Sequence, residues 1–109
     1  MTKSLETITA KIYLGLREGY TDVVHQCSEV EDFLQEYVDR VDLFVTVSPT
    51  TFIYKDGREP GVVIGLINYP RFLRESLKKQ AEEIALLCKE RYKQNRLSIE
   101  YQDQTVMLE

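Results

Sequence analysis

Apolar and polar residues alternate strictly over residues 7–16, and this period of two predicts a β-strand with one buried face. The apolar members of the alternation would share that face, and they are Ile8, Ala10, Ile12, Leu14 and Leu16. The pattern stops before Gly19, a residue that adopts a positive φ without a steric penalty. We therefore expect a strand followed by a loop.

Two further strand-like runs, residues 42–54 and 62–68, flank the segment 55–61, whose sequence is KDGREPG. Asp-Gly and Pro-Gly favour tight turns, and β-branched and aromatic residues fill the two runs. The second run is apolar on both faces, which indicates a central strand. The first run contains Pro49, which has no N–H to donate, so we expect an edge strand with a bulge or bend at 48–50.

Apolar residues recur at helical spacing in two longer segments. Ser28 is followed three residues later by a glutamate, which is the spacing of a capping box, so the first helix is expected to run from Ser28 to about Val41. An earlier start near Asp22 also fits the pattern. The second helix is expected from Pro70, a residue suited to a first turn, to about Gln94.

The last strand-like segment covers residues 97–108 and is interrupted by polar residues 102–104, which form either a bulge or a tight hairpin turn. The predicted order of elements is β-α-β-β-α-β, the ferredoxin-like arrangement. Right-handed crossovers would give a four-stranded antiparallel sheet of spatial order 4-1-3-2 with both helices on one face. We expect an α+β fold in a single domain spanning residues 1–109. Since this fold hosts many activities, it indicates no function by itself.

Composition and charge narrow the function classes. The chain has 109 residues and a net charge of −4, which argues against nonspecific binding of nucleic acid. Residues 62–67, in the predicted central strand, also lack the aromatic residues on which RNA-binding modules stack bases, so we expect no nucleic-acid partner. No apolar run is long enough to span a membrane, and no signal peptide precedes the first strand, so we expect a cytoplasmic protein.

The cysteines indicate neither a metal centre nor a disulfide framework. Cys27 and Cys88 form no CxxC motif, and Cys88 falls on the apolar stripe of the second predicted helix, where a free cysteine packs as a small core residue. His25 and Cys27 are close enough in sequence to chelate an ion together, but zinc sites need more protein ligands than two. We therefore expect neither a metal nor a cofactor.

In the predicted topology three connections meet at one end of the sheet. They are the loop after the first strand, the turn between the second and third strands, and the loop before the fourth. The predicted ligand-binding residues on them are Arg17, Tyr20, Lys55, Arg58 and Arg96. Because arginine binds phosphate or carboxylate through paired hydrogen bonds, we expect a small anionic ligand. The alternative is that these charges only keep loop tips hydrated and that Arg58 pairs with Glu59.

Helices on one face would leave the opposite face of the sheet open. Tyr13 and Tyr101 lie on strands predicted to be neighbours and are expected to form an aromatic patch on this open face, which would support a homodimer or a protein partner. The sequence has no nucleophile–base pair and no nucleotide-binding motif. We therefore favour a noncatalytic binding or regulatory module that dimerises through the open face and binds a small anion.

Two alternatives stay open. The first is a small cofactor-free enzyme with a pocket between sheet and helices, in which a tyrosine or carboxylate acts as acid or base. This alternative predicts an enclosed cavity near Tyr13 or Tyr54. The second is an accessory protein of a virus or mobile element that acts on a host factor, which the small size of the chain permits.

Overall fold

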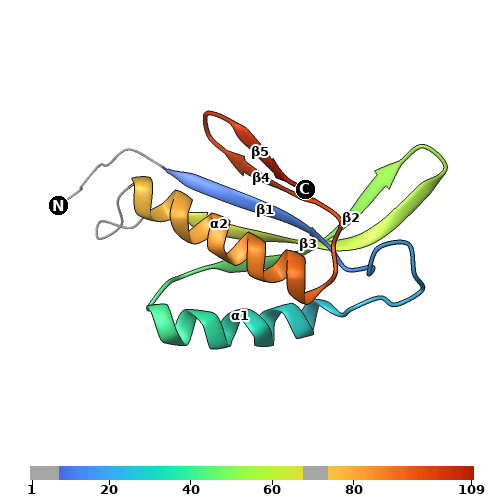
Figure 1. Cartoon of the computed structure of the whole chain (residues 1–109), viewed down its shortest axis with the longest axis horizontal. Coiled ribbons are helices and arrows are strands. Elements are labelled where there is room, and N and C mark those ends of the chain that lie inside the picture. Colours follow the sequence, from blue (N-terminus) through green and yellow to red (C-terminus); the bar gives the residue numbers. More distant parts are fainter. Residues whose placement is uncertain (1–7, 68–73) are drawn as a thin grey trace.

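The computed structural model describes residues 8–67 and 74–109, which form five strands and two helices. In chain order the elements are β1 (Thr9–Gly15), α1 (Cys27–Val41), β2 (Thr46–Tyr54), β3 (Gly57–Ile67), α2 (Arg74–Arg91), β4 (Leu97–Tyr101) and β5 (Thr105–Leu108). The strands pair antiparallel in the spatial order β2-β3-β1-β4-β5. Both helices lie on one face of this open sheet (Figure 1).

The predicted α+β class, the antiparallel sheet and the two helices on one face are confirmed. The strands β2, β3, β1 and β4 also lie in the predicted spatial order. The strictly ferredoxin-like, four-stranded sheet is wrong, because β5 adds a fifth strand beyond β4. The polar residues 102–104 form a hairpin turn, which is closed by a 2.7 Å hydrogen bond from the Tyr101 N–H to the Gln104 carbonyl. The chain therefore reverses at this point instead of continuing as one bulged strand.

The core lies between the sheet and the two helices. At its centre Ile12 of β1 pairs with Ile64 of β3 on one side and with Ile99 of β4 on the other, and none of the three is exposed to solvent. The helices cover this layer with Val30, Leu34 and Tyr37 of α1 and with Leu77, Ala81, Ile84, Ala85 and Cys88 of α2. No polar or charged residue is buried among the residues that the structure describes. Burial of each isoleucine contributes about 1.5–3 kcal/mol to this layer.

The first helix begins one residue earlier than predicted, at Cys27, with Gln26 rather than Ser28 at the cap position. Gln26 has an extended backbone, and its N–H donates a 3.3 Å hydrogen bond to Glu29 Oε1. The capping glutamate is thus Glu29, because the preceding loop delivers its last extended residue at position 26 rather than 28. The predicted start of the second helix, Pro70, lies outside the described residues.

The prediction that the Pro49 segment is an edge strand is confirmed, since β2 lies at the edge of the sheet. The bulge or bend expected at 48–50 is wrong. β2 pairs with β3 in continuous register along its whole length, and Pro49 lies opposite Val62. An edge strand has one side without a neighbour, so the missing N–H of a proline there needs no partner and does not force a bulge.

The turn between β2 and β3 is shorter than the predicted segment 55–61. Only Lys55 and Asp56 separate the two strands, and Asp56 has a φ of 64° in the left-handed region that such a two-residue turn requires. Residues 57–61 belong to β3 and pair with β2. The hairpin therefore extends past the end of the helices as a two-stranded arm (Figure 1).

The expected aromatic patch of Tyr13 and Tyr101 is wrong. Tyr101 is buried on the helix-covered face, and its hydroxyl donates to the Lys78 carbonyl of α2 at 3.3 Å. Tyr13 lies on the open face, where its hydroxyl donates to Glu100 Oε1 at 3.1 Å. The two tyrosines are on neighbouring strands, as predicted, but the register places their side chains on opposite faces.

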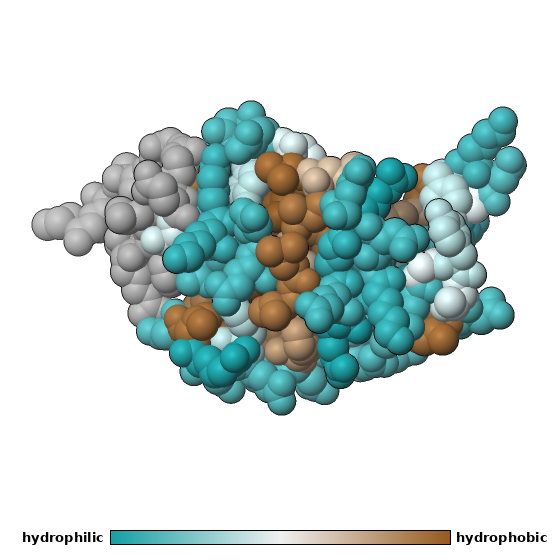
Figure 2. All heavy atoms as spheres, viewed as in Figure 1, coloured by the Kyte–Doolittle hydropathy of each residue, from teal (hydrophilic) through white to brown (hydrophobic). Residues whose placement is uncertain are grey.

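The surface of the molecule is largely hydrophilic on the side shown in Figure 2, and one narrow hydrophobic band crosses it. Such a surface agrees with a chain in which 29% of the residues are charged. In residues 8–67 and 74–109, no helix is long and apolar enough to cross a membrane.

Candidate functional site

Three connections meet at the end of the sheet where β1 finishes. They are the loop after β1, the β2–β3 hairpin and the loop from α2 to β4 (Figure 1). Arg17 contacts all three: it forms an isolated β-bridge with Val24, its side chain lies near Glu59 of β3, and its carbonyl accepts a hydrogen bond from Gln94. Charged side chains from separate segments converge here, so we regard this region as the candidate functional site.

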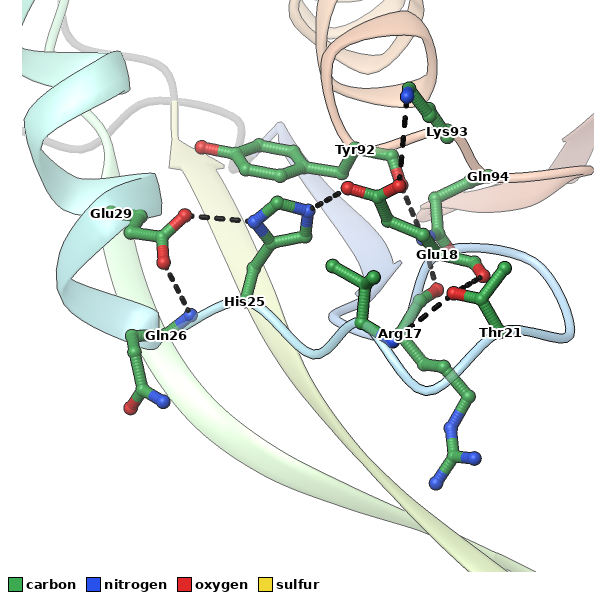
Figure 3. Close-up of polar contacts among 10 residues, drawn as sticks. Arg17, Glu18, Thr21, His25, Gln26, Glu29, Tyr92, Lys93 and Gln94 are labelled. Carbon is green, nitrogen blue, oxygen red and sulfur yellow. Dashed lines mark hydrogen bonds and ion pairs between the residues drawn. The ribbon is translucent and has the colours of Figure 1, made fainter.

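His25 is the centre of a polar network on the helix-covered side of this region (Figure 3). Its Nε2 lies 2.6 Å from Glu18 Oε2, and its Nδ1 lies 2.8 Å from Glu29 Oε2 in the first turn of α1. Lys93 places its Nζ 3.8 Å from the other oxygen of Glu18. The network thus connects the loop after β1, the start of α1 and the residues that follow α2.

The geometry indicates that His25 is protonated. An ionised carboxylate only accepts hydrogen bonds, so both ring nitrogens must donate, and only the imidazolium carries two N–H groups. Burial by itself would lower the pKa of His25, but the hydrogen bonds and negative charges of Glu29 and Glu18 outweigh it and raise the pKa above its ordinary value. The hydrogen bond from His25 correspondingly lowers the pKa of Glu29. With both nitrogens occupied, His25 has none left to act as a general base.

Tyr92 supports the histidine ring from the end of α2. The two ring centroids are 4.9 Å apart with an interplanar angle of 72°, so the rings meet edge to face. Phe33 of α1 also packs against Tyr92, at a centroid distance of 6.0 Å. Burial raises the pKa of Tyr92 to about 12, so this residue stays neutral. The imidazolium is therefore held between two carboxylates and against an aromatic side chain.

Arg17 directs its side chain away from the histidine network (Figure 3). Its Nε lies 3.9 Å from Glu59 Oε1, an ion-pair distance that is too long for a hydrogen bond. The Nε atom is inaccessible to solvent and has no hydrogen-bond partner among the described residues. The two side chains remain about one-third exposed, at 35% and 37%. Arg17 and Glu59 thus present opposite charges on the open face with hydrogen-bonding capacity to spare.

Two aromatic residues of β2 adjoin this charge pair on the open face. Phe52 is the register partner of Glu59, and its ring covers Gly61, where an added Cβ would collide with the ring and lie 2.8 Å from the Leu14 carbonyl oxygen. Tyr54 follows two residues later on the same face. Desolvation, and then the hydrogen bond to Glu59 and its charge, raise the pKa of Tyr54.

The five predicted ligand-binding residues are spread over this end of the molecule. Arg17 lies at its centre, whereas Tyr20 is 98% exposed at the tip of the loop. Lys55 is in the hairpin turn, Arg58 lies beside it at the start of β3, and Arg96 just precedes β4; all three are exposed. Strand alternation puts Arg58 on the face opposite Glu59 of β3, and the glutamate instead forms its ion pair with Arg17.

The histidine network was not predicted as a site. Its one sequence signal is the spacing of four residues between His25 and Glu29, which is typical of a side-chain pair on a helix. Glu18 lies seven residues before His25, and only a reversal of the loop at Gly19, with φ of 52°, returns the chain to it. Tyr92 is more than sixty residues further along the chain, so no local pattern links it to the others.

The cysteines take different positions. Cys88 is a buried core residue, as predicted, and burial raises the pKa of its thiol to about 12. Cys27 is partly buried, and its Sγ lies 3.7 Å from Glu31 Oε2. His25, which the sequence spacing would allow to chelate an ion together with Cys27, has both ring nitrogens occupied by carboxylates. Within 8–67 and 74–109 no group of three or more His, Cys, Asp or Glu side chains is arranged to hold a metal ion.

The surface has open hollows away from the charge pair. One of about 380 Å³ lies between α1 and the segment leading into β2, and its lining residues are Glu31, Leu34, Gln35, Val38, Leu43, Phe44, Val45 and Val47. Another of about 180 Å³ crosses β1, β2 and β3 near Lys11 and Gly65. Neither is the enclosed cavity near Tyr13 or Tyr54 that the enzyme alternative predicted.

Comparison with known proteins adds information on the fold. The sequence matches no family model and no curated protein. A phage SAM lyase solved in complex with S-methyl-5'-thioadenosine matches with a TM-score of 0.76 and 15% sequence identity, over 99% of this chain and 95% of that chain. A phage SAM lyase in the apo state matches with a TM-score of 0.72 and 16% identity, over 99% and 94% of the two chains.

These matches overturn the preference for a noncatalytic binding or regulatory module. Both structures are of an enzyme, and they agree with the alternative of a small enzyme better than with a non-enzymatic protein. The low sequence identity explains why no motif in the sequence led to this comparison. Over nearly its whole length, the chain has the fold of the phage SAM lyases.

Proposed function

We propose that this protein is a lyase that cleaves S-adenosylmethionine and releases S-methyl-5'-thioadenosine. The observation that carries this proposal is the fold shared, over 99% of the chain, with a phage SAM lyase solved with that thioether. Its phage source also supports the alternative of a viral accessory protein, for which S-adenosylmethionine of the host would be the target.

The reaction needs neither a cofactor nor a protein nucleophile. The substrate sulfur is a cationic sulfonium, and when its bond to Cγ of the methionine part breaks, the electron pair leaves with sulfur as a neutral thioether. A lyase adds no water, so the four-carbon fragment either bonds its own carboxylate to that carbon or loses a proton. A protein accelerates such a step by holding the substrate in a reactive conformation. The lack of a nucleophile–base pair in the sequence is therefore compatible with catalysis.

The charge pair on the open face suits the amino-acid end of this substrate. That end carries a carboxylate and an ammonium on one carbon, and Arg17 and Glu59 offer the two complementary charges side by side. The guanidinium grips a carboxylate with paired hydrogen bonds. The 3.9 Å separation of Arg17 from Glu59 leaves donors and acceptors for both groups of the ligand.

The aromatic residues next to the charge pair suit the rest of the substrate. Phe52 and Tyr54 lie on the same face as Glu59, and aromatic rings stack on the apolar faces of a purine. A tyrosine ring also attracts a cation placed over it, such as the sulfonium. We assign the adenine and the sulfonium to this pair of side chains.

The proposed site is exposed in a single chain, since both members of the charge pair are about one-third accessible. We propose that a second copy covers the open face, in the homodimer expected from the sequence, and so excludes water from the bound substrate. Light scattering on the purified protein tests this arrangement. A monomer at concentrations that support catalysis would contradict it.

The direct test of the function is incubation of the purified protein with S-adenosylmethionine, followed by chromatography of the products. We expect S-methyl-5'-thioadenosine to accumulate in proportion to time and protein. S-adenosylhomocysteine has an uncharged sulfur and a poor leaving group, so it is expected to stay intact. If no thioether forms above the spontaneous rate, the proposed function is wrong.

A matched pair of variants tests the assigned site. Arg17→Gln is expected to raise KM by on the order of tenfold or more, because it removes the charged partner of the substrate carboxylate. Arg40→Gln makes the same change of charge in the exposed last turn of α1, whereas the candidate site adjoins the first turn of that helix. We expect this variant to retain normal kinetics. Equal KM values in the two variants would remove Arg17 from the site.

A further inference from the structure

The backbone of Arg17 is fixed by the loop that follows it. The Glu18 N–H donates to the Val23 carbonyl at 2.9 Å, and the His25 N–H donates to the Leu16 carbonyl at 2.7 Å, so residues 16–18 and 23–25 form a short antiparallel ladder. Gln94 adds a donor from the other side, with its Nε2 2.7 Å from the Arg17 carbonyl. The position of the guanidinium therefore depends on whether this loop stays closed.

Side chains at both ends of the ladder close the loop. The side chain of His25, at the end of the loop, binds Glu18 at its start. His25 also binds Glu29 and so links the loop to α1. At the tip, the Thr21 hydroxyl donates to the Glu18 carbonyl at 2.7 Å and accepts from the Val23 N–H at 3.1 Å. Of these contacts, only those of the histidine change with pH near neutrality.

The titratable groups that face His25 come from each element packed against it. Glu18 comes from the loop, Glu29 from α1 and Tyr92 from the residue after α2, while Lys93 reaches the ring only through its ion pair with Glu18. The protonated ring donates to both carboxylates. A neutral ring has a single N–H, so one nitrogen would turn a lone pair toward a carboxylate oxygen and an attraction would become a repulsion. Loss of one proton from His25 therefore removes one of its two hydrogen bonds, to Glu18 or to Glu29, that hold the loop closed.

We propose that His25 is a positioning residue for Arg17: as an imidazolium it holds the loop of residues 17–25 closed, and its deprotonation frees Arg17 and weakens binding of ligands that carry a carboxylate. This inference rests on the proposed function, in which Arg17 binds the carboxylate of the substrate. It gives the site a pH response that comes from a residue which does not contact the ligand.

The first part of the test is the titration of the histidine itself. The chain contains a single histidine, so the signal of its Hε1 ring proton is unambiguous in the NMR spectrum. We expect Glu18→Gln to move the titration to lower pH, because it replaces a charged acceptor by a neutral amide. Glu36→Gln removes an equal charge from the exposed face of α1 and is expected to leave the titration unchanged. If His25 titrates identically in the two variants, the proposed stabilisation of the imidazolium by Glu18 is wrong.

The second part is ligand affinity as a function of pH. S-adenosylhomocysteine carries the amino-acid end and is a suitable probe, whereas S-methyl-5'-thioadenosine lacks it. Between about pH 6 and about pH 9, we expect affinity for the first probe to fall on the order of tenfold with the midpoint of the His25 titration. Affinity for the second is expected to stay constant. In His25→Gln the affinity for S-adenosylhomocysteine should no longer depend on pH. This result would distinguish titration of His25 from ionisation of the probe itself.

Thermodynamic reciprocity gives an independent readout. If protonation of His25 favours S-adenosylhomocysteine, this ligand must raise the pKa of His25 by the same free energy, and S-methyl-5'-thioadenosine must not. The protection factors of the Glu18 and His25 amides against hydrogen exchange should fall above the titration midpoint, because both amides lie in the ladder. These measurements use the unmodified protein and do not depend on whether His25→Gln folds.

The outcomes separate the two proposals. If S-adenosylhomocysteine binds equally well on both sides of the titration, the role of His25 is wrong while the proposed function stands. If neither probe binds at any pH, the proposed function and this inference both fail. If the probe binds with the expected pH response but the protection factors of the Glu18 and His25 amides do not change, the response comes from elsewhere and the loop mechanism is wrong.

Discussion

The centre of the sheet and the end of β1 are held together by different physics. Ile12, Ile64 and Ile99 meet at the centre by burial, which is nondirectional and requires only apolar side chains of suitable volume. At the end of β1, His25 and Glu18 depend on particular atoms separated by 2.6 Å. The buried centre therefore determines which fold forms, whereas the polar contacts at the end of β1 determine how the side chains of the candidate site are positioned.

The largest expected effect comes from the centre of the sheet. Ile64→Ala removes a fully buried side chain and leaves a cavity, so we expect the free energy of unfolding to fall by about 2–5 kcal/mol. Urea unfolding measures the change. Ile53→Ala, at a residue that is 77% exposed, is the matched control and should cost far less. Similar losses in the two variants would mean that burial does not dominate at the centre.

A smaller effect is expected at the end of β1, and it depends on pH. The pKa of His25 is raised in the folded protein, so its network contributes fully below about pH 6.5 and its contribution is lost as pH rises through the folded-state pKa. The pKa of Glu29 is lowered, so its contribution is lost on acidification. Urea unfolding on both sides of the folded-state pKa of His25 measures this effect. The free energy of unfolding should fall at alkaline pH in the natural protein and should not fall in His25→Gln. An equal fall in the free energy of unfolding of both proteins would mean that His25 does not cause the pH dependence.

The smallest effect is expected at the rim of the network. Lys93 is 75% exposed and lies 3.8 Å from Glu18, so Lys93→Gln should change the free energy of unfolding by less than about 0.5 kcal/mol. The same variant should leave the His25 titration nearly unchanged, because solvent screens the lysine charge. A loss as large as that of Ile64→Ala would show that the end of β1 is as important for folding as the centre.

Much of the fold was predictable because it follows from periodicity. The alternation over 7–16 identified a strand with one buried face, and Pro49 identified an edge strand. The features that were left open or predicted wrongly concern local geometry that periodicity does not encode. Whether residues 102–104 bulge or reverse the chain depends on the partner available to the next strand, and here β4 accepts β5. Tyr101 illustrates the same point, since the register of β4 on β1 decides which face it occupies.

The candidate site was predictable only in part. The predicted topology placed Arg17 where the three connections meet, as the structure also has it, but Glu59, which lies near Arg17, was considered only as a partner of the adjacent Arg58. The contacts of His25 could not be derived, since Glu18 and Tyr92 approach it from opposite parts of the chain. Interactions that depend on tertiary positions leave no periodic signal in the sequence.

The position of Pro49 has a consequence for how copies of this protein meet. An edge strand exposes a row of backbone donors and acceptors on which a foreign strand can assemble, and this is a common route to aggregation. Pro49 interrupts that row in the middle of β2, because it supplies no donor. Uncontrolled growth of the sheet is thereby discouraged at this edge, and any lengthening of the sheet by strand addition would be favoured at the opposite edge, along β5.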